Sequence, residues 1–123
     1  MNESKGSVLI VDDEFLIVMG LHYMAEEIGL NVCGTAATAR DAVRIAQEHR
    51  PQIVLMDVRL KGKQDGVDAA LAIHETVGCP VVFITGSKEP ETIQRIHQDH
   101  PAFILIKPIL LHQLRDAVSR ILG

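Results

Sequence analysis

Five short apolar runs recur along this chain of 123 residues, and most of them are rich in β-branched side chains. They occupy residues 7–11, 31–35, 53–56, 81–84 and 102–106, of which the second is the weakest. A strand that is apolar at every position is buried on both of its faces, which is typical of parallel sheets. The runs therefore predict a parallel sheet with both faces covered.

Between these runs, apolar residues recur at helical spacing. The stripes that predict the first, second, third and fifth helices are Ile17, Leu21, Met24 and Ile28; Ala39, Ala42, Val43 and Ala46; Val67, Ala70, Leu71 and Ile73; and Leu111, Leu114, Val118 and Ile121. Thr38, three residues before Asp41, is expected to cap the second helix. A fourth helix, beginning near Pro90, has only Ile93 and Ile96 on its apolar side, so we expect it to be the least firmly packed.

Strands that alternate with helices in this way predict the α/β class. Right-handed crossovers leave few topologies, and the favoured one is a flavodoxin-like, doubly wound sheet of five parallel strands in the order 2-1-3-4-5, with five helices. A chain of this length has the size of one domain, so residues 1–123 are expected to fold as a unit.

Charge and composition exclude several classes of protein. The net charge of −4 argues against direct binding to nucleic acid. No apolar run approaches the roughly 20 residues of a membrane span, and the polar N-terminus does not resemble a signal peptide. Cys33 and Cys79 belong to no C-x-x-C pair and are expected to be free thiols. We therefore expect a cytoplasmic protein.

Polar residues follow four of the five runs, at the point where each strand should end. Asp12 and Asp13 follow the first run, Asp57 the third, Thr85 the fourth and Lys107 the fifth. Ligands of parallel α/β sheets bind outside the carboxyl ends of the strands, so these side chains are expected to converge. Carboxylates within about 5 Å repel one another by several kcal/mol per pair, so the cluster requires a cation. Oxygen ligands without His or Cys favour Mg²⁺.

This combination predicts phosphoryl chemistry. A metal bound by the three aspartates, with Lys107 and Thr85 opposite, would form a cradle for a dianionic phosphoryl group. Asp57 is the natural nucleophile because it follows the central strand, and its attack on phosphorus would give an acyl phosphate. Gly86 beside Thr85 leaves room for the phosphoryl group to approach the backbone.

Each residue alone also has an ordinary structural explanation. Asp13 can cap the first helix, Asp57 can lie in a turn, Thr85 can be a strand-end hydroxyl and Lys107 can extend to solvent. The joint arrangement is what favours a functional site.

Two other motifs favour structural interpretations. Residues 62–66 lack the G-x-x-x-x-G-K-[ST] pattern of a phosphate loop and are expected to form a turn. His97 and His100 form an H-x-x-H pair without an evident third ligand, so both are expected at the surface.

Four ordered motifs, VDDE (11–14), LMD (55–57), FITG (83–86) and IKP (106–108), resemble the receiver domain of two-component response regulators over essentially the whole chain. The resemblance implies phosphorylation of Asp57 by a phosphohistidine donor, either a sensor histidine kinase or a histidine phosphotransfer protein. It also implies that the domain catalyses only its own phosphoryl transfer and slow hydrolysis.

The resemblance further implies roles for individual residues. Asp13 and the backbone carbonyl of Arg59 would bind Mg²⁺ directly, and Asp12 would bind it directly or through water. Lys107 would pair with the phosphoryl oxygens, and Thr85 would hydrogen-bond to one of them.

Three neighbouring positions complete this pattern. Arg59 and Ser87, together with Gly86, would line the path of the attacking water and tune the lifetime of the acyl phosphate. The family also implies a cis peptide bond between Lys107 and Pro108.

One position departs from the family. Receivers usually carry Tyr or Phe three residues before the lysine, whereas this chain has Ile104, and Phe103 is expected on the other face of the sheet. The stretch 82–86 instead resembles a subgroup with an F-x-T-G motif and no switch aromatic.

The implied module is a single-domain regulator, a phosphorelay shuttle or the N-terminal part of a longer protein. Its fourth helix, fifth strand and fifth helix are expected to bind a downstream protein or output domain, and phosphorylation can promote a homodimer.

Two alternatives stay open but are disfavoured. A phosphatase of the haloacid-dehalogenase type needs an acid two residues after the nucleophile, where this chain has Arg59. A scaffold that has lost phosphorylation would not retain all five site residues.

Overall fold

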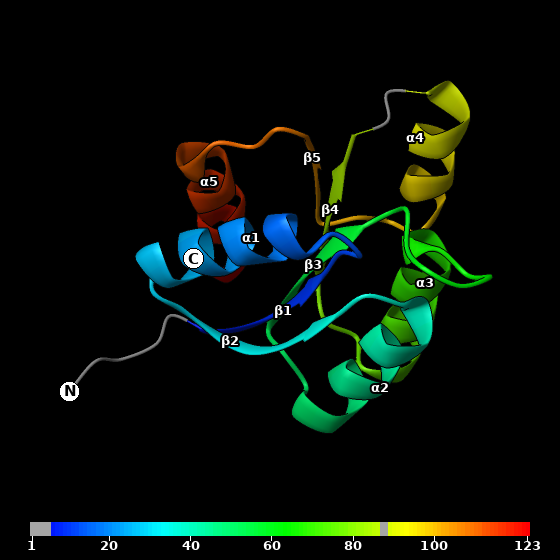
Figure 1. Ribbon diagram of the computed structural model, residues 1–123, viewed down its shortest axis with the longest axis horizontal. Coiled ribbons are helices and arrows are strands. Elements are labelled where there is room, and N and C mark those ends of the chain that lie inside the picture. Colours follow the sequence, from blue (N-terminus) through cyan, green and yellow to red (C-terminus); the bar gives the residue numbers. More distant parts are fainter. Residues whose placement is uncertain (1–5, 87–88) are drawn as a thin grey trace.

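The computed structural model describes residues 6–86 and 89–123, which form a five-stranded parallel sheet with helices on both faces (Figure 1). The strands are β1 (Gly6–Val11), β2 (Leu30–Ala36), β3 (Ile53–Asp57), β4 (Val81–Thr85) and β5 (Phe103–Ile106). The helices are α1 (Phe15–Glu27), α2 (Ala39–His49), α3 (Gly66–Thr76), α4 (Pro90–Gln98) and α5 (Leu111–Leu122). The order β2-β1-β3-β4-β5 confirms the predicted flavodoxin-like topology.

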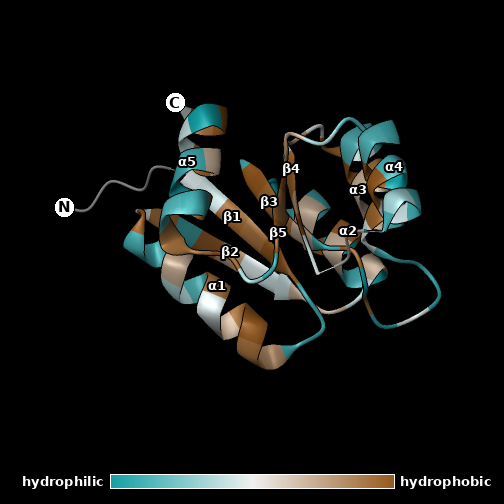
Figure 2. Cartoon of the chain, turned by 90° about the horizontal axis from the view of Figure 1, so that it is seen from above, coloured by the Kyte–Doolittle hydropathy of each residue, from teal (hydrophilic) through white to brown (hydrophobic). Residues whose placement is uncertain are grey.

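The central strands are buried on both faces, because α1 and α5 cover one face and α2, α3 and α4 cover the other (Figure 1). Figure 2 shows the hydrophobic residues concentrated on the strands. Successive residues of a strand therefore enter two different cores. Phe103 packs against the core under α1 and α5, whereas Ile104 packs against the core under α2, α3 and α4. These two residues face opposite sides of the sheet, as predicted.

The starts of α2 and α3 reflect their capping residues. The Asp41 amide donates to Oγ1 of Thr38 (3.1 Å), so Thr38 caps α2 as predicted. Helix α3 begins after Asp65, whose side chain forms a capping box with Asp68. This cap was not predicted from the sequence. The apolar spacing correctly predicted α3, although one of its residues, Leu71, is 51% exposed.

Helix α4 is the most weakly buried helix of the fold. Ile96 is its single fully buried residue, fewer than in any other helix, and residues 90–95 are all exposed or half-buried. The poor apolar stripe seen in the sequence accounts for this packing. The exposed His97 and His100 at the end of α4 agree with their expected surface position.

The pairing of β1 with β2 contains a step of one residue. Val8 lies opposite Val32 but Leu9 lies opposite Gly34, so Cys33 is an extra residue in β2. Both Cys33 and Cys79 are free thiols, as predicted. None of the described helices is long and apolar enough to cross a membrane.

Candidate functional site

The residues predicted from the strand ends converge at one edge of the sheet. Asp12 and Asp13 follow β1, Asp57 and Thr85 are the last residues of β3 and β4, and Lys107 follows β5. One carboxylate oxygen from each of the three aspartates lies within 4.8 Å of the other two. Asp12, Asp57 and Thr85 are buried, and Asp13 is half-buried. The parallel topology thus assembles the cluster that the sequence predicted.

Lys107 provides a positive charge inside this cluster. Its ammonium nitrogen donates to Oδ2 of Asp12 at 3.0 Å and to Oδ1 of Asp57 at 3.3 Å. Its backbone amide donates to the Thr85 carbonyl (2.9 Å), which fixes Lys107 beside the end of β4. The peptide bond between Lys107 and Pro108 is cis, as the resemblance implied.

Asp12 is held by backbone contacts at the end of β1. The Asp12 amide donates to the Ala36 carbonyl (3.0 Å), and Oδ1 of Asp12 accepts from the Glu14 amide (2.9 Å). The cap position of α1 is Glu14, and no side chain caps this helix. The alternative that Asp13 is a helix cap is therefore wrong, and the Asp13 carboxylate stays available to the site.

Burial and like charge perturb the titration of the site. Burial, together with the neighbouring Asp12 carboxylate, raises the pKa of Asp57 to about 6, although Lys107 partly opposes this rise. Burial alone would lower the pKa of Lys107, but its hydrogen bond to Asp12 and the two negative charges outweigh burial and raise that pKa. Lys107 therefore stays protonated, and Asp57 takes up a proton at a higher pH than an ordinary aspartate.

A cavity of about 560 Å³ opens above Asp57. The residues that line it are Asp13, Glu14, Asp57, Val58, Arg59, Thr85, Gly86, Glu89, Thr92 and Lys107. Arg59 and Gly86 thus line the cavity above Asp57, and their role on the path of the attacking water stays a prediction. Ser87 lies outside the described residues. Glu89 and Thr92, at the start of α4, were missed, and the available signal was their closeness to Thr85 along the chain.

The first turn of α3 packs directly beneath the Asp57 backbone. The Gly66 amide donates to the Val58 carbonyl at 2.7 Å, and a β carbon at position 66 would overlap the Asp57 carbonyl oxygen. Only glycine permits this approach. The backbone that carries Asp57 is therefore fixed by α3 as well as by the sheet.

The carboxylate cluster fits a hard divalent cation. Its three acidic side chains offer only oxygen, and neither His nor Cys is part of the cluster. Carboxylates paired with phosphate chemistry are typical of Mg²⁺. Asp12, Asp13 and Asp57 could hold such an ion.

The model of the response regulator receiver domain matches residues 8–119 of this chain. The chain belongs to the response regulator receiver family. It is 37% identical over 116 residues to the phyllosphere-induced regulator PhyR of Methylorubrum extorquens, covering 94% of this chain and 43% of PhyR. It is 34% identical over 112 residues to the transcriptional regulatory protein PdtaR of Mycobacterium tuberculosis, covering 91% of this chain and 54% of PdtaR. The receiver domain thus spans about half the length of these curated relatives.

A solved receiver structure is also closely similar. The signal receiver domain of a modulated diguanylate cyclase from Desulfovibrio desulfuricans G20 superposes with a TM-score of 0.90 at 34% identity. The alignment covers 95% of this receiver domain and 93% of that chain. Fold and family therefore agree.

Proposed function

We propose that this receiver domain is a signalling module in which Asp57 accepts a phosphoryl group from a phosphohistidine. The donor would be a sensor histidine kinase or a histidine phosphotransfer protein. The observation that carries the proposal is the gathering of three carboxylates within 4.8 Å, beside Lys107 and below an open cavity. Such a concentration of negative charge is energetically unfavourable unless a bound cation offsets it.

The proposed transfer is a nucleophilic displacement at phosphorus. A carboxylate oxygen of Asp57 forms the new P–O bond, and the P–N bond to the donor imidazole breaks. The electron pair of that bond returns to the imidazole nitrogen, which then takes up a proton. Lys107 would exchange its contact with Asp57 for the phosphoryl oxygens, and the Thr85 hydroxyl would donate to one of them.

The acidic cluster would serve as the metal site of this reaction. Asp12, Asp13 and Asp57, with the backbone carbonyl of Arg59, would hold Mg²⁺. When bound, this ion supplies positive charge that offsets the charge of the phosphoryl oxygens.

The acyl phosphate would be removed by slow hydrolysis. Water would attack phosphorus and the Asp57 carboxylate would leave. Arg59 and Gly86 line the cavity through which water must pass, and Ser87 is the third proposed tuning position. The domain would act on no substrate other than its own phosphoryl group.

Exposed apolar side chains on α1 support a docking surface for the donor. Phe15, Leu16, Met19 and Tyr23 are between 54% and 79% exposed. Phe15 and Leu16 directly follow Glu14, which lines the cavity. Exposed apolar patches of this kind mark interaction sites. Because a donor must bring its histidine to Asp57, the surface that borders the cavity has to be covered by that donor.

We assign the downstream partner to a second surface, formed by α4, β5 and α5. A shallow cavity of about 500 Å³ at the end of α4 includes Phe103 and Ile104. The partner would be an output domain or a separate protein, and phosphorylation can promote a homodimer through this surface. The donors act in the cytoplasm, where we also place this domain.

The test is incubation with acetyl phosphate and Mg²⁺, followed by intact mass measurement. We expect one phosphoryl adduct on the wild type, none on Asp57→Asn, and none when the metal is removed with EDTA. Asp116→Asn, which changes an exposed aspartate on α5, is the matched control and should be labelled like the wild type. Equal labelling of the Asp57→Asn variant would reject the assignment.

A further inference from the structure

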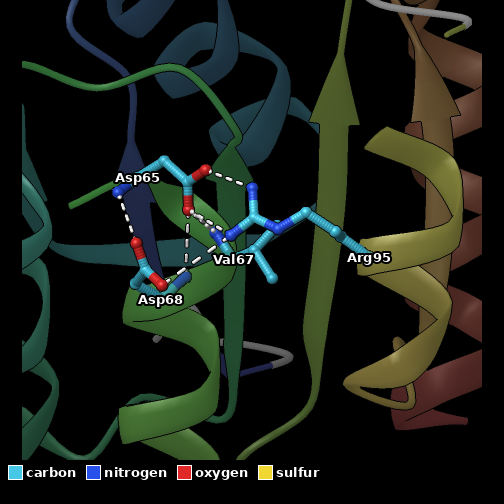
Figure 3. Close-up of polar contacts among 4 residues, drawn as sticks. All are labelled: Asp65, Val67, Asp68 and Arg95. Carbon is cyan, nitrogen blue, oxygen red and sulfur yellow. Dashed lines mark hydrogen bonds and ion pairs between the residues drawn. The ribbon is translucent and has the colours of Figure 1, made fainter. Parts of the chain in front are cut away.

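Helix α4 is tied to the start of α3 by a single arginine. Arg95 donates to Oδ2 of Asp65 at 2.6 Å and to Oδ1 at 3.3 Å, and its guanidinium lies 3.7 Å from Asp68 (Figure 3). Partial burial alone would raise the pKa of Asp65, but the hydrogen bonds and charge of Arg95 help to hold that pKa below its ordinary value. The pair is therefore charged at neutral pH and joins two helices that lie far apart in the sequence.

Asp65 is fixed to the backbone that carries Asp57. Its Oδ1 accepts from the amides of Val67 and Asp68 at 3.0 and 3.1 Å, which locks the carboxylate onto the first turn of α3. The next residue, Gly66, packs against the Asp57 carbonyl and donates to the carbonyl of Val58. A displacement of the β3 end is therefore passed to Asp65 through direct contacts.

The two ends of α4 are held very differently. Its C-terminal end is anchored by buried Ile96 and by buried Asp99, whose Oδ1 lies 3.1 Å from Nδ1 of His74 on α3. None of residues 90–95 is fully buried, and Thr92 lines the cavity above Asp57. The N-terminal half of α4 is therefore held less firmly than this anchor, and Arg95, in the last turn beside Ile96, ties the helix to the start of α3.

Receivers usually carry a switch aromatic, Tyr or Phe, at the position that is Ile104 in this receiver domain. Ile104 has no ring that could rotate between two positions, so the state of Asp57 needs another route to α4. We propose that the Arg95–Asp65 ion pair transmits the state of Asp57 to α4. This inference rests on the proposed phosphorylation of Asp57, and it assigns Arg95 as a positioning residue rather than a catalytic one.

The test compares three variants with the wild type. Arg95→Gln removes the charge but keeps most of the side chain. Asp65→Asn removes the opposite charge while retaining a good N-cap for α3. Arg44→Gln is the matched control, because Arg44 forms similar exposed ion pairs with Asp41 and Glu48 on α2, away from the site.

The readout is the change in the amide NMR signals of residues 91–98 when beryllium fluoride, a mimic of the phosphoryl group, is added with Mg²⁺. In Arg95→Gln and Asp65→Asn we expect this change to fall at least about twofold, the size expected for loss of an exposed ion pair. Coupling is reciprocal, so these two variants should also bind beryllium fluoride more weakly than the wild type. Arg44→Gln should respond like the wild type.

The outcomes separate this inference from the function on which it rests. If the wild type forms no adduct with acetyl phosphate, the proposed function fails and the inference fails with it. If the adduct forms but both variants show the wild-type response in α4, the inference alone is overturned. An equal loss of response in Arg44→Gln would also overturn it, because the effect would then be one of net charge.

Discussion

The ammonium nitrogen of Lys107 lies 3.3 Å from Oδ1 of Asp57, so the proposed phosphoacceptor is paired with a cation before a phosphoryl group arrives. The same nitrogen also pairs with Asp12. We therefore expect two functions of Lys107 that experiment can separate: it would stabilise the metal-free fold, and it would pair with the incoming phosphoryl oxygens.

Removing the charge of Lys107 should affect both functions. Lys107→Gln leaves two buried carboxylates without their cation, so we expect a loss of about 1–3 kcal/mol in the free energy of unfolding. We also expect adduct formation to slow roughly 10- to 100-fold, because the donor to the phosphoryl oxygens is lost. Urea unfolding in EDTA and timed mass measurement check the two effects. Lys63→Gln, on the exposed loop before α3, should change neither; unaltered stability of Lys107→Gln would contradict the first expectation.

The pKa of Asp57 predicts how stability depends on pH. Because folding raises this pKa from 3.8 to about 6, the protonated carboxyl is favoured in the folded state. In the metal-free protein, the contribution of Asp57 to stability should therefore fall as pH rises from about 4 to about 7, by something on the order of 3 kcal/mol. Asp57→Asn should lack this contribution, so the variant should be more stable than the wild type at pH 7.5 but not at pH 4. Urea unfolding of both proteins in EDTA at pH 4 and pH 7.5 provides the measurement. If the difference in free energy of unfolding between the variant and the wild type is the same at both pH values, the expectation is wrong.

Metal binding should stabilise the fold through the acidic cluster. Above the dissociation constant, each tenfold rise in free Mg²⁺ should add about 1.4 kcal/mol to the free energy of unfolding. Asp13→Asn should weaken this dependence, since it removes one of the three carboxylates. Thermal unfolding across a Mg²⁺ titration provides the measurement. The matched control is Asp41→Asn on α2, which should behave like the wild type; a melting temperature of the wild type that is independent of Mg²⁺ would argue against the site.

Two glycine-to-alanine substitutions should have opposite effects. Gly66→Ala places a methyl group into the Asp57 carbonyl, so the backbone must move, at a cost of about 1–3 kcal/mol or more. Gly20→Ala lies on the exposed side of α1 with no atom in its way, so the better helix propensity should stabilise the protein by about 0.5–1 kcal/mol. Urea unfolding of both variants checks the pair. If Gly66→Ala is as stable as the wild type, α3 does not pack against Asp57 as closely as described.

Sequence reasoning predicted the features that depend on local patterns and on parallel topology. The buried runs predicted all five strands, and strand ends such as Asp12, Asp57 and Lys107 then had to meet at one edge. It did not predict the ion pair between Arg95 and Asp65, because these residues are 30 positions apart and meet only through the placement of α4 beside α3.

Two further features could not be predicted, for the same physical reason. Leu71 follows the helical stripe of α3 in the sequence, yet the position of the neighbouring elements leaves it exposed. The exposed apolar side chains of α1, including Leu16 and Tyr23, also gave no clear signal, since an apolar residue looks the same in a sequence whether it is buried or exposed. Tertiary packing, not local propensity, decides both.

The one-residue step in β2 has a consequence for engineering this receiver domain. Beyond Cys33, β2 stays in register with β1 up to Ala36, whose carbonyl holds the Asp12 amide. The contact that holds this metal-site carboxylate therefore depends on the pairing beyond the step and not on Cys33 itself. Deleting the extra residue would leave Gly34 opposite Leu9, so we expect a shortened β2 to keep the Ala36 carbonyl on the Asp12 amide. A residue inserted between Gly34 and Ala36 would instead move that carbonyl away from Asp12, so libraries of deletions and insertions at this edge should give opposite outcomes on the two sides of the step.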